Sequence, residues 1–164
     1  MNTIIHKNIL RKRMLWLVMI GLAVYLIQER ITIVFTESVN ATILWHSNAE
    51  IKLWDFANYR LEEEKITDEL KQYTRNGYLT VTKRVACMDG QLLEKRELEY
   101  YCDNFLIGKA KTKSMTGNPL TPFEYNGRVP DNYVFLLGDH PDSYDSRYWG
   151  FAEKDTLIRG IRII

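Results

Sequence analysis

The sequence predicts a mainly β domain of antiparallel strands, with one N-terminal transmembrane helix and one short surface helix. Three observations support this fold class. Runs rich in β-branched and aromatic residues recur along the chain, separated by turn residues. A charge-free apolar run occupies residues 14–27, behind a basic N-terminus. Leu61, Ile66 and Leu70 form a partial helical stripe among charged residues, which is typical of a helix on a surface.

The N-terminal segment is expected to hold the protein in a membrane. The apolar run is shorter than the roughly 20 residues of a transmembrane helix, and its length also fits the core of a signal peptide. No cleavage site of small residues follows it, and residues 31–35 are apolar again, so we expect an uncleaved anchor over residues 14–35. Lys and Arg are concentrated before this run, which predicts that residues 1–13 are cytoplasmic and residues 36–164 periplasmic, at a bacterial inner membrane.

The rest of the chain predicts one β-rich domain without a linker. Strands are expected where apolar and β-branched residues cluster, at residues 43–45, 51–54, 78–87, 132–137 and 156–164. The surface helix is expected within residues 59–71, ending near Asn76-Gly77. A polar loop or loose hairpin is expected over residues 109–122.

Composition gives no reason to expect a cofactor, a metal or a nucleic acid. The formal net charge is +1, which offers no general attraction for a polyanion. The two cysteines do not form a Cys-x-x-Cys pair, and the three histidines are scattered, so the spacing of a zinc site is missing. No phosphate-binding glycine loop or dinucleotide-binding fingerprint is present.

One lysine is expected in an unusual position. The alternation of the strand at residues 78–87 places Lys83 on the same face as Leu79, Val81 and Val85. Apolar neighbours disfavour a charged amine and lower its pKa, which suits a general base. The alternative is an edge strand from which Lys83 extends to water.

A polar cluster follows the strand predicted at residues 132–137. Residues 138–151 hold three aspartates, two serines and an arginine between two glycines and large aromatic residues. Local physics alone favours a turn rich in Asp, Ser and Pro. Functional groups are also often placed where a rigid element ends, so the cluster is a candidate site.

Four segments resemble motifs of the type I signal peptidases, and they follow one another along the chain in the order of that family. Gly-Asp-x-x-Asp followed by Asp-Ser-Arg-Tyr-Trp-Gly, at residues 138–150, resembles the C-terminal signature of that family, and residues 128–133 resemble its usual lead-in. Residues 82–86 resemble the lysine box, and residues 36–39 resemble the serine box. The short chain and the variant His140-Pro141 look most like the conjugative-transfer branch, the TraF-type pilin peptidases.

This resemblance implies a Ser/Lys dyad in which Ser38 is the nucleophile and Lys83 the general base. It implies that the backbone N–H of Ser38 and the hydroxyl of Thr36 stabilise the oxyanion, although Thr36 also fits a plain strand residue. The supporting residues that it implies, from the C-terminal signature, are Asp139, Ser143, Asp145 and Arg147.

Among these residues, Asp145 and Arg147 match positions that hold the site together, and Ser143 matches a serine that orients the lysine amine. The sequence departs from the housekeeping enzymes in two places. The spacing from Asp142 to Asp145 is one residue shorter, and Val39-Asn40 stands where Met and often Pro are usual. These departures bear on the alignment of Ser143 and on the local backbone at Ser38.

The function implied is that of a membrane-anchored serine endopeptidase without a cofactor. Its substrate would be a pilin or another secreted precursor, matured by hydrolysis or by cyclisation beside a conjugative transfer apparatus. The alternatives are a non-catalytic membrane-anchored β module of pilus or secretion assembly, and a housekeeping signal peptidase. The presence of both Ser38 and Lys83 favours the enzyme, because a degenerate relative is expected to lose one of them.

The two cysteines, Cys87 and Cys102, lie in the part of the chain predicted to be periplasmic. That compartment is oxidising, so a disulfide between them is expected. It would stabilise the fold by about 3 kcal/mol through the closed loop. The alternative is two buried free thiols.

Overall fold

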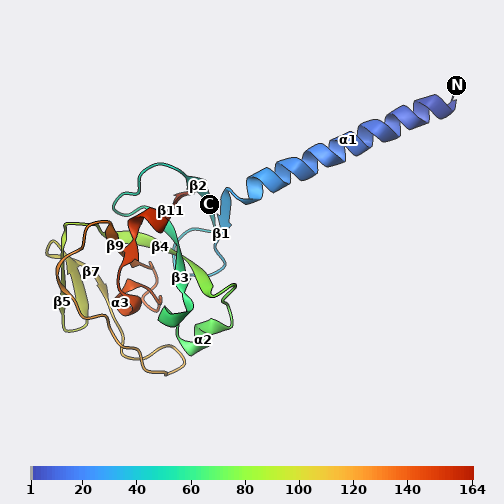
Figure 1. Cartoon of the computed structure of the whole chain (residues 1–164). Coiled ribbons are helices and arrows are strands. Elements are labelled where there is room, and N and C mark those ends of the chain that lie inside the picture. Colours follow the sequence, from blue (N-terminus) through green and yellow to red (C-terminus); the bar gives the residue numbers. More distant parts are fainter. Residues whose placement is uncertain (1) are drawn as a thin grey trace.

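The computed structural model describes the backbone of residues 2–164 and the side chains of residues 11–164. It is mainly β, and every strand pair is antiparallel, which confirms the predicted antiparallel β domain. A long helix, α1 (Asn2–Gln28), projects from the β body (Figure 1). Side chains of residues 1–10, within the predicted basic N-terminal segment 1–13, lie outside the described part of the chain.

Two sheets form the β body. The larger sheet has the order β1-β2-β11-β3-β4-β9-β10, and the smaller one the order β7-β6-β5-β8. The strands of the larger sheet are β1 (Ile31–Ile33), β2 (Ile43–Ser47), β3 (Phe56–Glu62), β4 (Tyr78–Cys87), β9 (Tyr133–Leu137), β10 (Ala152–Glu153) and β11 (Ile158–Arg162). Those of the smaller sheet are β5 (Leu92–Arg96), β6 (Glu99–Cys102), β7 (Phe105–Lys109) and β8 (Asn126–Arg128).

Only short helical segments belong to the β body within the described residues. They are α2 (Asp68–Lys71), α3 (Ser146–Trp149) and two 3-10 turns at Glu63–Lys65 and Lys154–Thr156.

Strand β9 lies between two parts of the core. Val134 and Leu136 pack in the cluster formed with β3 and β4, whereas Phe135 and Leu137 pack in the cluster that faces the smaller sheet. Because both faces of β9 are covered, its sequence is apolar without alternation. The polar cluster therefore begins where a rigid, buried strand ends, next to β4, which pairs with β9.

The prediction of a surface helix within residues 59–71 is wrong for most of these residues. Tyr59 and Leu61 are buried and alternate with exposed Arg60 and Glu62, which is the period of a strand. They belong to β3, which pairs with β4 over its full length. The hydrogen bonds and burial gained by this long-range pairing outweigh the local helical stripe. Only the four residues of α2 are helical, together with the preceding 3-10 turn.

The strand expected at residues 51–54 is also wrong. Trp54 has φ 67°, in the left-handed region, which interrupts an extended backbone. The Asp55 carboxylate accepts the Lys52 N–H at 2.8 Å and closes a turn there. The strand that follows β2 therefore begins two residues after Trp54, at Phe56.

The anchor predicted for residues 14–35 needs a correction at its end. The helix stops at Gln28, and Ile31–Ile33 form β1, which pairs with β2. These residues are β-branched and are drawn into the sheet by that pairing. The prediction of a transmembrane helix is not confirmed: among the helices of residues 2–164, none is both long enough and apolar enough to cross a membrane.

Candidate active site

Lys83 lies in the middle of the larger sheet, on β4. Its side chain is only 3% exposed, on the face that β4 turns toward the core with Val85. The alternative of a lysine reaching water from an edge strand is therefore excluded, since β4 has a neighbour on each side. Burial lowers the pKa of the Lys83 amine from 10.5 to about 8, an effect that nearby Asp145 opposes and Arg147 reinforces.

Ser143 is the hydrogen-bond partner of this amine. Lys83 Nζ donates to Ser143 Oγ at 2.6 Å, and both side chains are buried. The Ser143 backbone is held in turn, because its N–H donates to the His140 carbonyl at 3.0 Å and its own carbonyl accepts from Arg147 Nη2 at 3.0 Å. The orientation of the lysine amine thus depends on the loop that follows β9.

Asp145 and Arg147 form a buried ion pair beneath this loop. Arg147 Nε and Nη2 donate to the two Asp145 carboxylate oxygens at 2.8 and 2.7 Å, and Asp145 is fully buried. Asp145 also accepts the backbone N–H of Gly138 at 2.9 Å. A buried ion pair is costly unless the remaining hydrogen-bonding groups of both side chains are satisfied. Here these groups bind backbone atoms, the Ser143 carbonyl for Arg147 and the Gly138 N–H for Asp145.

Ser38 lies in the connection between β1 and β2 and is half-buried. Its carbonyl accepts the N–H groups of Asp139 at 2.7 Å and His140 at 3.3 Å. The Asp139 carboxylate accepts the N–H of Asn40 at 2.7 Å and Nε of Arg84 at 2.6 Å. The serine turn is therefore tied to the loop after β9 at Ser38 itself and at Asn40.

One groove joins these groups. A cavity of about 550 Å³ is lined by Ser38, Lys83, Ser143 and Thr36, with further walls from residues 32–35, the first half of β4 and α2. Within the described residues, the Lys83 amine hydrogen-bonds to Ser143 and makes no hydrogen bond to Ser38. Thr36 is exposed at the rim of the groove. Ser38 and Lys83 are far apart in the sequence, and the fold brings them to one cavity.

Comparison with known proteins gives the family. The family described as "Signal peptidase, peptidase S26" matches residues 11–164. The chain belongs to this signal peptidase family.

Two signal peptidases illustrate the similarity. The chain is 31% identical over 94 residues to a "Probable signal peptidase I-2" of Synechocystis sp. (strain ATCC 27184 / PCC 6803 / Kazusa); this stretch is 56% of the chain and 40% of that relative. The chain thus spans well under half of the relative's length. A crystal structure of a signal peptidase I from Enterococcus faecalis V583 is similar with TM-score 0.43 and 20% identity, over 70% of this chain and 99% of that one.

Three residues that support this candidate site were not among those predicted. A Cβ on Gly138 would come within 2.8 Å of the Ser38 carbonyl, so the close approach of the two loops requires glycine. Ser146 Oγ accepts the Leu136 N–H at 2.9 Å. The Tyr100 hydroxyl donates to the carbonyls of Phe123 and Arg147 at 2.7 and 3.0 Å. Gly138 and Ser146 stand in the C-terminal signature, whereas nothing in the sequence around Tyr100 indicated its contact.

The cysteines of the chain form a disulfide between Cys87 and Cys102. It joins the end of β4 to the end of β6 and therefore links the two sheets. The cysteines lie in the core cluster that packs against β9, away from the groove. The alternative of two free thiols is excluded.

Proposed function

We propose that the chain is a serine endopeptidase that removes leader peptides from exported precursor proteins, with Ser38 as nucleophile and Lys83 as general base. The observation that carries this proposal is a buried lysine with a lowered pKa that shares one groove with a half-buried serine. An amine with a pKa of about 8 is partly neutral near neutral pH, and only the neutral amine can accept a proton. Among the described side chains of residues 11–164, neither His46 nor His140 lines this groove, and Lys83 is the amine base that it offers.

The reaction would proceed through an acyl-enzyme. Ser38 Oγ attacks the scissile carbonyl carbon while Lys83 Nζ takes the hydroxyl proton. The lysine then returns this proton to the leaving amine as the peptide C–N bond breaks. Water then attacks the carbonyl carbon of the Ser38 ester while Lys83 Nζ accepts a proton from it. Lys83 returns this proton to Ser38 Oγ as the ester C–O bond breaks, which releases the new carboxyl terminus and restores the serine hydroxyl and the neutral amine. Hydrogen bonds between such groups often tighten only when substrate is bound, so Lys83 need not contact Ser38 beforehand.

The remaining predicted residues have supporting roles in this proposal. Ser143 accepts a hydrogen bond from Lys83 Nζ and so directs the lone pair of the neutral amine. Asp145 and Arg147 hold the loop that carries Ser143, and Asp139 holds the turn that carries Ser38. The Ser38 N–H and the Thr36 hydroxyl are the proposed donors to the oxyanion; Thr36 lies in the same groove.

We propose that the precursor is a pilin and that the context is a conjugative transfer apparatus, because the variant His140-Pro141 resembles that of the conjugative-transfer branch. The acyl-enzyme can react with water or with the N-terminal amine of the pilin itself. A tethered amine has a high effective concentration, so it competes with water when it reaches the ester. The mature pilin then carries either a free carboxylate or a ring closed by a peptide bond.

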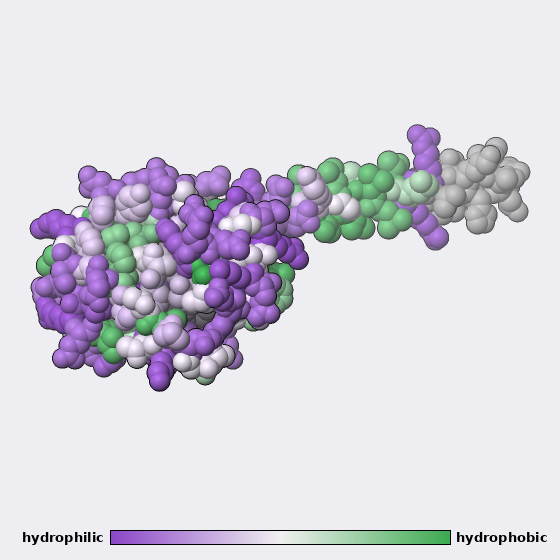
Figure 2. Space-filling model, turned by 60° about the horizontal axis from the view of Figure 1, so that its bottom comes forward, coloured by the Kyte–Doolittle hydropathy of each residue, from purple (hydrophilic) through white to green (hydrophobic). Residues whose placement is uncertain are grey.

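We also propose that α1 attaches the protein to a bacterial inner membrane, with the catalytic domain on the periplasmic side. Members of the signal peptidase I family are membrane-associated. The apolar side chains from Met14 to Ile27 are exposed around the helix (Figure 2). Such a continuous apolar surface is expected to be covered by lipid. Attachment there would keep Ser38 near the site where precursors leave the membrane.

Coexpression with candidate pilin precursors, followed by intact-mass measurement, tests the enzyme. We expect cleavage by the wild type and no cleavage by Ser38→Ala or Lys83→Met. The matched controls Ser47→Ala and Lys52→Met change the same residue types outside the groove and should cleave normally. Full cleavage by Ser38→Ala would favour a non-catalytic assembly module. A product lighter by one water than the hydrolysed pilin identifies cyclisation.

A further inference from the structure

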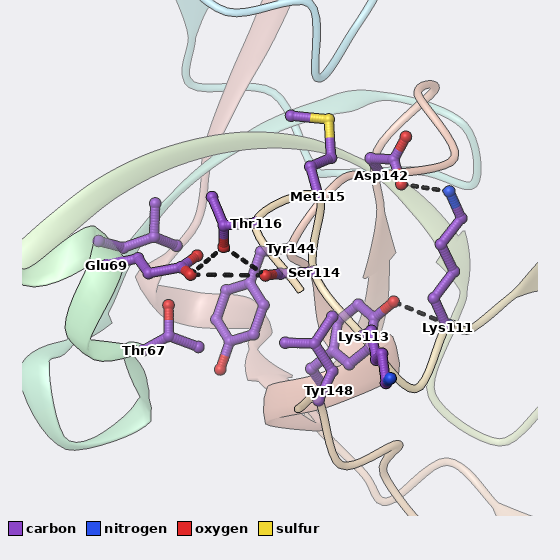
Figure 3. A pocket seen from close by; sticks show the side chains of 12 residues that line it. Thr67, Glu69, Lys111, Lys113, Ser114, Met115, Thr116, Asp142, Tyr144 and Tyr148 are labelled. Carbon is purple, nitrogen blue, oxygen red and sulfur yellow. Dashed lines mark hydrogen bonds and ion pairs between the residues drawn. The ribbon is translucent and has the colours of Figure 1, made fainter. Parts of the chain in front are cut away.

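A second cavity lies beside the groove, between α2, the loop of residues 111–120 and the tyrosines that follow Ser143 (Figure 3). We propose that it is a substrate subsite that takes one aromatic side chain of the precursor, at a distance from the scissile bond. This inference rests on the proposed peptidase function. It adds to that function a binding determinant that the motifs of the family do not contain.

The cavity adjoins the groove that holds Ser38 and Lys83. Leu70, Asp142 and Tyr144 line both of them. Figure 3 shows the ion pair between Lys111 and Asp142 at one side of the cavity, across from Glu69. A peptide that lies along the groove therefore passes the mouth of this cavity and can place a side chain in it.

The size and lining of the cavity suit an aromatic ring. Its volume is about 170 Å³, and an apolar cavity of about 150 Å³ is known to bind benzene. Tyr144 and Tyr148 stack with their ring centroids 5.4 Å apart and offer a surface for a further ring. Met115 on the loop supplies a thioether, which makes favourable contacts with aromatic rings.

The charges at the cavity point to the same ligand. Lys111 is neutralised by Asp142, whereas Lys113 also lines the cavity and forms no ion pair among the described residues. A lysine beside an aromatic ring gains a cation–π interaction. An aromatic side chain uses both this cation and the apolar walls. An aliphatic side chain uses only the walls.

The outer wall of the cavity is held in place by one carboxylate. Glu69 on α2 accepts hydrogen bonds from Ser114, Thr116 and Asn118, which all belong to the loop. The hydrogen bonds from Thr116 and Asn118 are the main cause of a lowered Glu69 pKa. The Lys111 N–H donates to the Tyr148 hydroxyl at 3.0 Å and fixes the start of the loop. A wall ordered before binding reduces the entropy that the ligand must lose.

A scan with internally quenched peptides tests the subsite. The peptides have alanine before the cut and carry one Phe that is moved through successive positions of an alanine-rich sequence. We expect one position at which Phe lowers KM about tenfold relative to Ala, with kcat unchanged. Leu, which uses only the apolar walls, should lower KM less than Phe does, and Glu should give a KM close to that of Ala.

Three variants locate the effect. Met115→Ala removes an 82% exposed side chain at the cavity, and Glu69→Ala releases the wall; both should raise the KM of the best Phe peptide to that of the Ala peptide. Phe105→Ala removes a comparably exposed side chain on β7, which does not line the cavity, and should keep the tenfold difference.

The outcomes separate this proposal from the peptidase itself. Peptides that are cleaved without any preference for Phe, or a preference that survives in Met115→Ala and Glu69→Ala, overturn the subsite and leave the peptidase standing. An equal effect of Leu or Glu overturns the aromatic ligand. Cleavage of no peptide, or equal cleavage by Ser38→Ala, overturns the peptidase and the subsite together.

Discussion

The Lys83 amine determines the pH range in which the proposed dyad can act. Its pKa is lowered to about 8, chiefly by burial. Below that pH the amine is protonated in most molecules and cannot accept the Ser38 proton. We therefore expect kcat/KM to rise with pH through about 8 and to level off above it, in a pH–rate profile of the purified protein. A profile that stays flat from pH 6 up to about 10, close to the ordinary pKa of a lysine, would contradict the role of Lys83 as base.

The same burial makes Lys83 a cost to stability at neutral pH. Its folded pKa of about 8 lies below its ordinary value of 10.5, so between these values the unfolded chain binds more protons and stability rises with pH. Below pH 8 the full cost is present, about 3 kcal/mol for this shift.

Lys83→Met replaces the amine with an apolar chain of similar length and should raise the free energy of unfolding at pH 7. The gain should shrink between pH 8 and 10.5, as measured by urea unfolding of both proteins at each pH. The control Lys52→Met, at an exposed site, should follow the wild type. A loss of stability that is equal at every pH would show that packing, and not charge, governs this position.

At the scale of the elements, the disulfide determines how the two sheets are held together. It closes a loop with a sequence separation of 15 residues, from the end of β4 to the end of β6. The double variant Cys87→Ala/Cys102→Ala should lower the free energy of unfolding by about 3 kcal/mol, because the unfolded chain regains the entropy of that loop. Chemical denaturation measures the change, and reduction of the wild type should produce a similar loss. Unchanged unfolding after full reduction would contradict this estimate.

At the scale of the whole molecule, α1 and the β body have different surfaces. The body buries apolar residues in three core clusters and exposes others singly or in small groups, whereas α1 exposes a continuous apolar run from Met14 to Ile27. Leu17→Asp together with Leu22→Asp places two charges on that surface and should release the full chain from lipid vesicles in a flotation assay. The control variant Phe105→Asp, on β7 of the smaller sheet, should float with the vesicles as the wild type does. Flotation of the α1 variant would show that another surface binds lipid.

Much of the fold could be predicted where local pattern and tertiary environment agree. The strand at Tyr78–Cys87 was predicted with its observed bounds, and Tyr133–Leu137 within one residue. The strand predicted at residues 51–54 and the helix predicted within residues 59–71 were wrong, because the apolar spacing of these segments fits more than one secondary structure. Pairing with β4 decided that residues 56–62 form a strand.

By itself, the sequence determined the antiparallel β architecture of the body and the signal peptidase family, since both depend on the order and type of residues along the chain. It also indicated Ser38 and Lys83, because the motifs and the alternation of one strand mark them. Only the tertiary structure decided that Lys83 is buried against Ser143, that Gly138 lets two loops meet at Ser38, and that Glu69 holds a distant loop. These contacts join segments far apart in the chain, and their distances and burial arise only when the sheets pack.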